Sequence, residues 1–223
     1  MPVVSGSQRF VMAAFRFPTP AIAASATDAR YLLWIDGVGA YLVCLAQRVT
    51  IGGHRPDGQN ADLPLMSNLN RQHATLIRGT EGYVLESHGP VKVSGRPVQE
   101  KLFLTGDREL ELGSSVKVRF RLPSVLSMTA TLDFVSDRRP SHTIDGVILM
   151  EDNLLIGPSR DNHIRCPNWS EAVLLYRRGE QLWCKARGDV FVDQSLARSG
   201  SPLRPGQIVQ GKDLRFRLES APW

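Results

Sequence analysis

Short runs of alternating or continuous apolar residues recur along the chain, and Gly, Pro, Asn and Asp separate them, whereas helical periodicity is nearly absent. In the first half, strands are expected at 31–35, 42–45, 48–51, 74–78, 83–86, 108–112 and 116–122. In the second half, they are expected at 147–150, 153–156, 172–177, 181–185, 190–192 and 214–218. Such closely spaced short strands predict an all-β sandwich or barrel.

The two halves of the chain repeat one another in order and in local chemistry. An identical Ile-Asp-Gly-Val begins at residues 35 and 144, and Ile-Gly begins at residues 51 and 156. Near the end of each half, Val-Arg-Phe-Arg-Leu at 118–122 matches Leu-Arg-Phe-Arg-Leu at 214–218. We interpret this as a duplication. It predicts a flexible N-terminal arm at 1–28, a domain at 29–122, a connector at 123–142 and a second domain at 143–223, each domain with its own core.

Composition restricts the compartment and the partners. The longest apolar runs, 10–15 and 41–46, are far shorter than the ~20 residues that a membrane helix needs. Cys44, Cys166 and Cys184 cannot all pair and show no zinc-ligand spacing, so we expect buried thiols in a reducing cytoplasm. The net charge of +5 comes from arginine, but the arginines are scattered. Neither a membrane nor a nucleic acid is therefore favoured as a partner.

No pattern of catalytic residues is visible in the sequence. The five histidines form no H-x-x-x-H pair, and no nucleophile elbow is present. Residues 206–212 match the G-x-x-x-x-G-K core of a nucleotide-binding loop, but Asp213 replaces the Ser or Thr that would hold Mg²⁺, and a strand pattern follows instead of a helix. We interpret the match as a hairpin turn, and we expect a non-enzymatic protein without a cofactor or metal site.

The first half carries a specific order of short motifs. Thr-Ile-Gly ends at Gly52, a polar loop follows, and then comes Asn70-Arg71-Gln72-His73-Ala74. Further on are Gly-Tyr-Val-Leu-Glu at 82–86, Val-Ser-Gly at 93–95 and Glu-Leu-Gly at 111–113. This order resembles the forkhead-associated (FHA) domain over residues 31–122, and residues 143–219 resemble a degenerate relative. The chain is thus expected to hold two tandem FHA-like antiparallel β-sandwich domains.

The resemblance implies a signalling module whose loops at one end of the sandwich recognise phosphothreonine in a partner protein, itself the substrate of a Ser/Thr kinase. The family uses a Gly-Arg pair, then Ser-x-x-His, then Asn-Gly. Gly53 replaces that arginine, Asn70 replaces the serine, and His88 with Gly89 stands at the Asn-Gly position. The later Asn-Gly turn corresponds to Ser94-Gly95.

The resemblance suggests two kinds of role in phosphopeptide binding. Arg71 would contact the phosphate or else be a solvated surface arginine, and Asn70 would donate to phosphate or else be a turn residue. Arg55 would compensate for the arginine missing at position 53, and an arginine introduced there would strengthen binding if the loop geometry stays otherwise intact. The expected phosphopeptide-binding residues are Arg71, Asn70, Arg55, Gly53, His88 and Ser94, and the expected loop supports are His73, Gly52 and Gly95.

The second half lacks the phosphate-binding residues. Pro158 replaces the first arginine, and in the segment 170–173 Glu171 is expected at the Arg71 position and Val173 at the His73 position. We therefore expect the second domain to bind no phosphopeptide. Two functions stay open for the whole chain: a phosphothreonine-dependent adaptor, or a scaffold that kept the fold and binds proteins without phosphate.

Overall fold

The computed structural model describes residues 29–124, 127–140, 142–179, 181–197 and 200–221, and within these ranges it contains strands and no helix. The predicted all-β class is confirmed. The first eleven strands are β1 (Arg30–Ile35), β2 (Gly39–Cys44), β3 (Arg48–Gly53), β4 (Leu63–Leu65), β5 (Ala74–Arg78), β6 (Tyr83–Ser87), β7 (Val91–Val93), β8 (Arg96–Val98), β9 (Lys101–Leu104), β10 (Arg108–Leu112) and β11 (Val116–Arg121). The others are β12 (Ala130–Phe134), β13 (Gly146–Leu149), β14 (Asn153–Gly157), β15 (Ile164–Arg165), β16 (Val173–Arg178), β17 (Gln181–Ala186), β18 (Phe191–Val192), β19 (Ser195–Leu196), β20 (Ser201–Leu203), β21 (Ile208–Gln210) and β22 (Arg215–Ser220).

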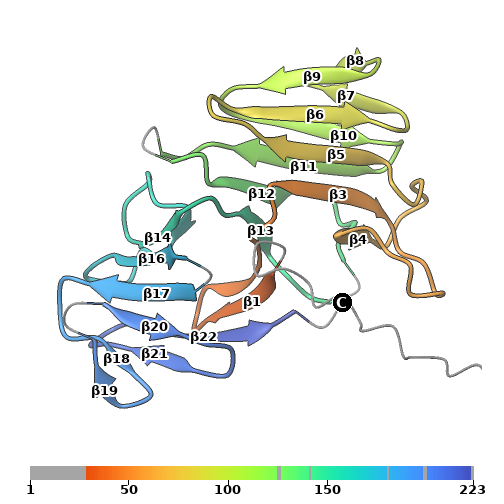
Figure 1. The fold of residues 1–223 in the computed structure, drawn as a ribbon. Coiled ribbons are helices and arrows are strands. Elements are labelled where there is room, and N and C mark those ends of the chain that lie inside the picture. Colours follow the sequence, from red (N-terminus) through yellow and green to blue (C-terminus); the bar gives the residue numbers. More distant parts are fainter. Residues whose placement is uncertain (1–28, 125–126, 141, 180, 198–199, 222–223) are drawn as a thin grey trace, which may run out of the picture.

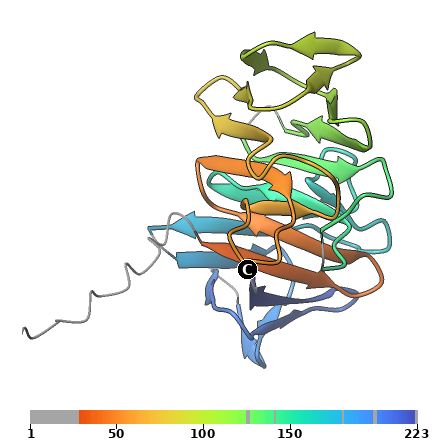
Figure 2. The same cartoon turned by 90° about the vertical axis from the view of Figure 1, so that its right-hand side faces the viewer.

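A 12-stranded sheet runs through the molecule in the order β19-β18-β21-β22-β1-β2-β13-β12-β11-β10-β7-β8. Two five-stranded sheets pack against it, with the orders β4-β3-β5-β6-β9 and β15-β14-β16-β17-β20. Figures 1 and 2 show the N-terminal strands, in red-orange, in the middle of the molecule. The long sheet therefore joins strands from both halves of the sequence.

Equivalent strands follow one another in the same order from either edge of the long sheet, so the sheet has an internal pseudo-twofold axis. The series β8-β7-β10-β11-β12-β13 corresponds to β19-β18-β21-β22-β1-β2, and the two series meet where β2 and β13 pair in parallel. An axis that lies in the sheet along the strands keeps these neighbours parallel and turns one face into the other. The two five-stranded sheets should then cover opposite faces.

The two cores confirm that arrangement. Leu42 and Cys44 of β2 belong to the core beneath β3, β5 and β6, whereas Val43 and Leu45 belong to the core beneath β14, β16 and β17. Consecutive residues of a strand point to opposite faces, so the central strands are buried on both sides. The structure thus holds two hydrophobic cores that share one sheet, and residues from both halves of the sequence contribute to each core.

The N-terminal hairpin β1–β2 lies next to the last strand of the chain. β1 pairs with β22 over residues 31–35, whereas β11 pairs with β12, a strand in the predicted connector. We call β3–β13 the first sandwich, and β14–β22 together with β1–β2 the second sandwich. The predicted boundaries 29–122, 123–142 and 143–223 stay a prediction about the sequence repeat, and the predicted arm 1–28 lies outside the described residues.

The repeated motifs differ in how far their structures correspond. Ile51-Gly52 and Ile156-Gly157 each lie in the last part of a strand and pair in parallel with the short strand that follows, β4 or β15. The identical tetrapeptides do not correspond, because Gly37 adopts a φ of 70° in the β1–β2 turn whereas Gly146 begins β13. Structural equivalence therefore follows the strands and not this exact sequence match.

Buried polar side chains bind backbone groups where the two sandwiches meet. The Arg78 guanidinium donates to the carbonyl oxygens of Met150 (2.9 Å) and Leu45 (3.4 Å), which follow β13 and β2. The Tyr83 hydroxyl donates to the Met128 and Leu149 carbonyl oxygens. These bonds satisfy carbonyls inside the molecule and hold both central strands against the first sandwich.

Candidate functional site

Three loops meet at one end of the first sandwich: 54–62 between β3 and β4, 66–73 between β4 and β5, and 88–90 between β6 and β7. His73 is 2% exposed and connects two of them. Its Nδ1 accepts the Asn70 backbone N–H (3.3 Å), so the proton is on Nε2, which donates to the Pro90 carbonyl (3.0 Å). The His88 N–H donates to the His73 carbonyl (2.9 Å). These bonds place His73 between loops 66–73 and 88–90, and its role as loop support stays a prediction.

Glycines allow the loops to approach β3 and His73 closely. A Cβ on Gly52 would collide with the backbone of Asn70 and Arg71, and a Cβ on Gly53 would lie 2.7 Å from the Leu69 carbonyl oxygen. A Cβ on Gly89 would lie 2.5 Å from Cε1 of His73. Position 53 has no room for a side chain, so the intact loop on which the expected gain from an arginine there depends would not be kept.

Arg55 and Arg71 connect the first two loops by reciprocal hydrogen bonds, a pair of contacts that we call the brace. Arg55, on the first loop, donates from Nη2 to the Leu69 carbonyl (3.0 Å), and its backbone N–H donates to Asn60 (2.6 Å). Arg71, on the second loop, donates from Nε to the Gln59 carbonyl (2.9 Å) and from Nη2 to the Gln59 side-chain oxygen. Each guanidinium is held by neutral oxygens and keeps further donors for an anion.

Asn70 and His88 lie beside this brace. Asn70 Nδ2 donates to the His88 carbonyl (3.0 Å), which leaves its second N–H available. The His88 ring is exposed, and its Nε2 lies 3.0 Å from Thr75 Oγ1. The structure thus brings Arg55, Arg71, Asn70 and His88 to one loop surface, supported by His73 and the buried glycines.

Ser94 and Gly95 do not join that surface. They form the tight β7–β8 turn, with φ values of 48° and 79°. β7 starts beside the 88–90 loop and its three residues run away from it, a span of about 10 Å at ~3.3 Å per residue. The predicted ligand contact of Ser94 and the predicted loop support by Gly95 at the Arg71 end therefore have no geometric support.

Sequence reasoning missed Gln59, which orients Arg71, and the β10–β11 turn. Ser115 Oγ of that turn lies 3.0 Å from Ser67 Oγ in the second loop. Gln59 sits in the polar stretch Asp57-Gly58-Gln59-Asn60, which marks a loop without indicating its contact. Only the approach of the two loops identifies these residues.

The corresponding end of the second sandwich has different chemistry. Ile51 pairs with Ala74 and Ile156 pairs with Val173, so Ala172 stands at the His73 position. The predicted alignment, which put Val173 there, is therefore wrong by one residue. In this alignment Glu171 is equivalent to Gln72. Glu171 accepts the Gly188 N–H (2.6 Å), and Asp213 accepts the Ser170 N–H (2.8 Å). Carboxylates replace cations at this end.

Two equivalent residues, Asp62 and His163, each bond to the strand that precedes their loop, β3 or β14. Asp62 accepts the Thr50 N–H (2.8 Å), and His163 Nδ1 accepts the Leu155 N–H (3.0 Å). His163 is 2% exposed, and its Nε2 is buried without a partner. Burial, with a smaller contribution from Arg121, lowers the pKa of His163 to about 4. The imidazole is therefore neutral in the folded chain near neutral pH.

The predicted nucleotide-loop match does not form one loop. Gly206 lies in the turn before β21 and Gly211 in the turn after it, so a strand separates them. Backbone N–H groups around a phosphate need one continuous loop before a helix. The interpretation of the match as a hairpin turn is corrected to two turns with the strand β21 between them.

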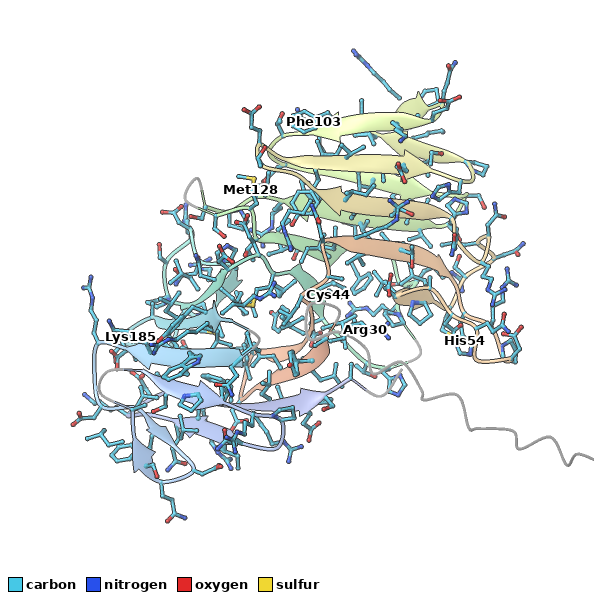
Figure 3. The ribbon with its side chains drawn as sticks, viewed as in Figure 1. Arg30, Cys44, His54, Phe103, Met128 and Lys185 are labelled. Carbon is cyan, nitrogen blue, oxygen red and sulfur yellow. The ribbon has the colours of Figure 1, made fainter. Side chains whose placement is uncertain are left out.

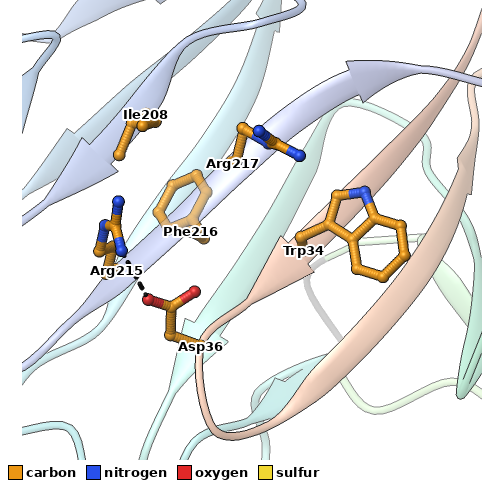
Figure 4. A pocket seen from close by; sticks show the side chains of 6 residues that line it. All are labelled: Trp34, Asp36, Ile208, Arg215, Phe216 and Arg217. Carbon is orange, nitrogen blue, oxygen red and sulfur yellow. Dashed lines mark hydrogen bonds and ion pairs between the residues drawn. The ribbon is translucent and has the colours of Figure 1, made fainter.

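A hollow of about 260 Å³ lies on the outer face of β1 and β22, beside Trp34 (Figure 4). Trp34 Nε1 donates to Glu219 Oε2 (2.8 Å), Arg217 pairs with Glu219 (2.5 Å) and Arg215 pairs with Asp36 (3.2 Å). These polar groups satisfy each other, so the hollow offers a ligand no unpaired charge among them.

The described residues contain no group of three potential metal ligands, and they include no helix able to cross a membrane. The three cysteines are free and buried, as predicted. Burial raises the pKa of the Cys44 thiol to about 12.

No protein-family model and no curated protein matches the chain. A structural match is found with the N-terminal FHA domain from EssC, a component of the bacterial Type VII secretion apparatus. The two chains share 10% identity, the match covers 85% of this chain and 92% of that one, and the TM-score is 0.23. A TM-score this low supports no inference about function.

Proposed function

We propose that this chain is a non-enzymatic protein-interaction module that binds a phosphothreonine-containing segment of a partner protein at the loop end of the first sandwich. The observation that carries the proposal is the reciprocal brace of Arg55 and Arg71 on the buried His73 support. Two guanidinium groups are held on one loop surface before a ligand arrives, which lowers the ordering cost of binding.

The donors on this surface suit a phosphate. Phosphothreonine carries a charge of about −1.5 to −2 at neutral pH and offers three strong acceptor oxygens. Arg71 uses its Nε and one Nη2 donor within the chain, so Nη1 stays available, and Asn70 keeps one amide N–H. Charge-assisted hydrogen bonds from these groups would hold the phosphate, while His88 borders the peptide.

Binding should be weak compared with a site that has an arginine at position 53. Losing one hydrogen bond to a charged group costs about 1.5–3 kcal/mol, which corresponds to a 10- to 150-fold loss of affinity. Arg55 reaches the same loops from two residues further along and would recover part of this. The module would act in the cytoplasm, where a Ser/Thr kinase marks its partner and buried thiols stay reduced.

The alternative is an interaction scaffold that needs no phosphate. The hydrogen bonds of Arg55 and Arg71 also favour this alternative, because they already stabilise loops 54–62 and 66–73 without a ligand. Under this alternative, the arginines maintain loop shape and an unmodified segment binds the loop surface.

The two functions are separated by titrating the full chain into fluorescently labelled pools of phosphothreonine peptides and identical unmodified peptides. We expect the anisotropy of the phosphorylated pool to rise first, and Arg71→Ala to weaken that binding at least about tenfold. Arg119→Ala, an exposed arginine on β11, is the matched control and should bind like the original chain.

Gln59→Ala tests the role of the brace, because it removes the side-chain acceptor of Arg71 and should change phosphopeptide affinity without unfolding the chain. Equal binding of both pools would support the scaffold. Binding of neither pool would contradict an interaction site at these loops.

A further inference from the structure

A second surface lies at the opposite edge of the first sandwich, where the two sheets end in β8 and β9. A groove of about 580 Å³ opens between these strands. Its lining comprises Val93, Ser94, Arg96, Pro97, Val98, Gln99, Lys101, Leu102 and Arg108. Three of these residues are cationic and none carries a carboxylate. Lys101 pairs with Glu86 (2.7 Å), so the positive charge of the groove comes from Arg96 and Arg108.

β9 is an unpaired strand edge. It is the last strand of its sheet and pairs with β6 on one side only. β8 ends the 12-stranded sheet, but Pro97 at its centre has no N–H to donate. Figure 1 shows both strands at the outer end of the molecule, away from the second sandwich. Of the two edges, β9 is the one with a full set of backbone donors.

Two side chains of β9 are apolar and exposed, one on each face of the strand. Leu102, which faces the groove, is 38% exposed, and Phe103, on the other face, is 52% exposed. Figure 3 shows Phe103 at the outer edge of the sandwich. An exposed edge strand that carries large apolar side chains is a template for pairing with another segment.

The equivalent edge of the second sandwich is blocked by a proline. Its equivalent of β9 is β20, Ser201-Pro202-Leu203, which ends the other five-stranded sheet. Pro202 removes a donor from that edge. The first sandwich keeps Leu102 and Phe103 at this place, so the open edge is specific to the first sandwich.

We infer that β9 is a docking edge for an extended segment of a partner protein in which acidic and apolar residues alternate. The segment adds a strand to β9 through main-chain hydrogen bonds, which is a known mode of peptide recognition. Its apolar side chains contact Leu102 and Val98, and its carboxylates meet Arg96 and Arg108. This surface is separate from the loops of Arg71 and does not depend on phosphate.

The charge and the strand geometry can be tested separately with the full chain. The probe is a fluorescein-labelled ten-residue peptide that alternates glutamate and valine, and the matched probe replaces every glutamate with lysine. A third peptide keeps the glutamates but carries N-methyl groups on alternate backbone nitrogens. Anisotropy is measured at low and at high salt.

We expect the glutamate peptide to bind, the lysine peptide not to bind, and the N-methylated peptide to lose binding. Changing both Arg96→Glu and Arg108→Glu should weaken the glutamate peptide about tenfold, since two surface charge contacts become repulsive. Arg119→Glu, which makes one such charge reversal on β11, should leave binding unchanged, as should Arg71→Ala. Amide exchange at residues 101–104 should slow when the peptide is bound.

Three results would overturn the inference. Absence of binding by the glutamate peptide would exclude the edge as a site for such segments, and equal binding of the N-methylated peptide would exclude strand addition. Tighter binding of a labelled single-stranded oligonucleotide than of the glutamate peptide, lost in the Arg96 and Arg108 double variant, would assign the groove to nucleic acid.

Discussion

At the scale of single residues, equivalent positions of the two sandwiches make the same backbone contact with chemically different side chains. Asp62 and His163 both accept a backbone N–H from the strand that precedes their loop. Asp62 also pairs with Arg30, whereas His163 is buried with one ring nitrogen unpartnered. A carboxylate suits the more exposed position and a neutral imidazole suits the buried one, because burial of an unpaired charge is costly.

His163 should make stability depend on pH in the mildly acidic range. Its folded pKa of about 4 lies below the ordinary value of 6.5, so the unfolded chain binds the proton first. Its contribution is complete above about pH 6.5 and is lost as the pH falls toward 4, a change of about 3 kcal/mol at most.

Urea unfolding at about pH 7 and about pH 4.5 would measure this loss. His163→Asn keeps an acceptor for the Leu155 N–H but cannot titrate, so its stability should fall less between the two pH values. His88→Asn removes an exposed histidine and should keep the original dependence. An unchanged dependence in His163→Asn would refute the assignment.

At the scale of elements, the close approach of the second loop to β3 determines which substitutions the site tolerates. A Cβ on Gly53 would lie 2.9 Å from the Ser67 carbonyl oxygen and 2.7 Å from the Leu69 carbonyl oxygen. Gly53→Arg should therefore displace this loop and reduce the free energy of unfolding by about 2 kcal/mol or more. Thermal unfolding would show this as a lower Tm.

Asn68→Arg is the control for that substitution, because residue 68 is exposed on the same loop and gains the same charge. It should leave the Tm within a few degrees of the original. If Gly53→Arg were equally stable and bound phosphopeptide more tightly, the close contact of this loop with β3 would not describe the protein in solution.

At the scale of the whole molecule, the second sandwich depends on the N-terminal hairpin. β1 covers one side of β22, and Leu33 and Ile35 fill the second core. A fragment of residues 143–223 lacks both strands and should not fold, so it cannot report on binding by the second sandwich. A permuted fragment that joins residues 143–221 to 29–45 by a short Gly-rich loop should fold, since Ala221 donates to the Arg30 carbonyl (3.1 Å).

Circular dichroism and the dispersion of amide proton resonances would compare the two fragments. A well-dispersed spectrum from 143–223 alone would show that the hairpin is dispensable, and a disordered permuted fragment would show that the second sandwich needs contacts with the first.

Much of the loop site was predictable because its signals are local. Gly52 ends one short motif, Asn70 and His73 lie in the next, and the resemblance places all three at one end of a sandwich. Gln59 and the lack of space at Gly53 were not predictable, because both depend on the contact between loops 54–62 and 66–73. Ser94 was misplaced because a turn motif does not say at which end of a strand it lies.

The sequence by itself determined the all-β class and most of the longer strands, because alternation of apolar residues reports burial strand by strand. It did not mark short strands such as β4, β8 and β9, and it did not show that β2 is buried on both faces. Only the tertiary structure decided that β2 pairs with β13 and β1 with β22. Periodicity describes the faces of a strand, whereas the choice of neighbours depends on packing between segments far apart in the chain, and so the first strands of the protein complete its last sandwich.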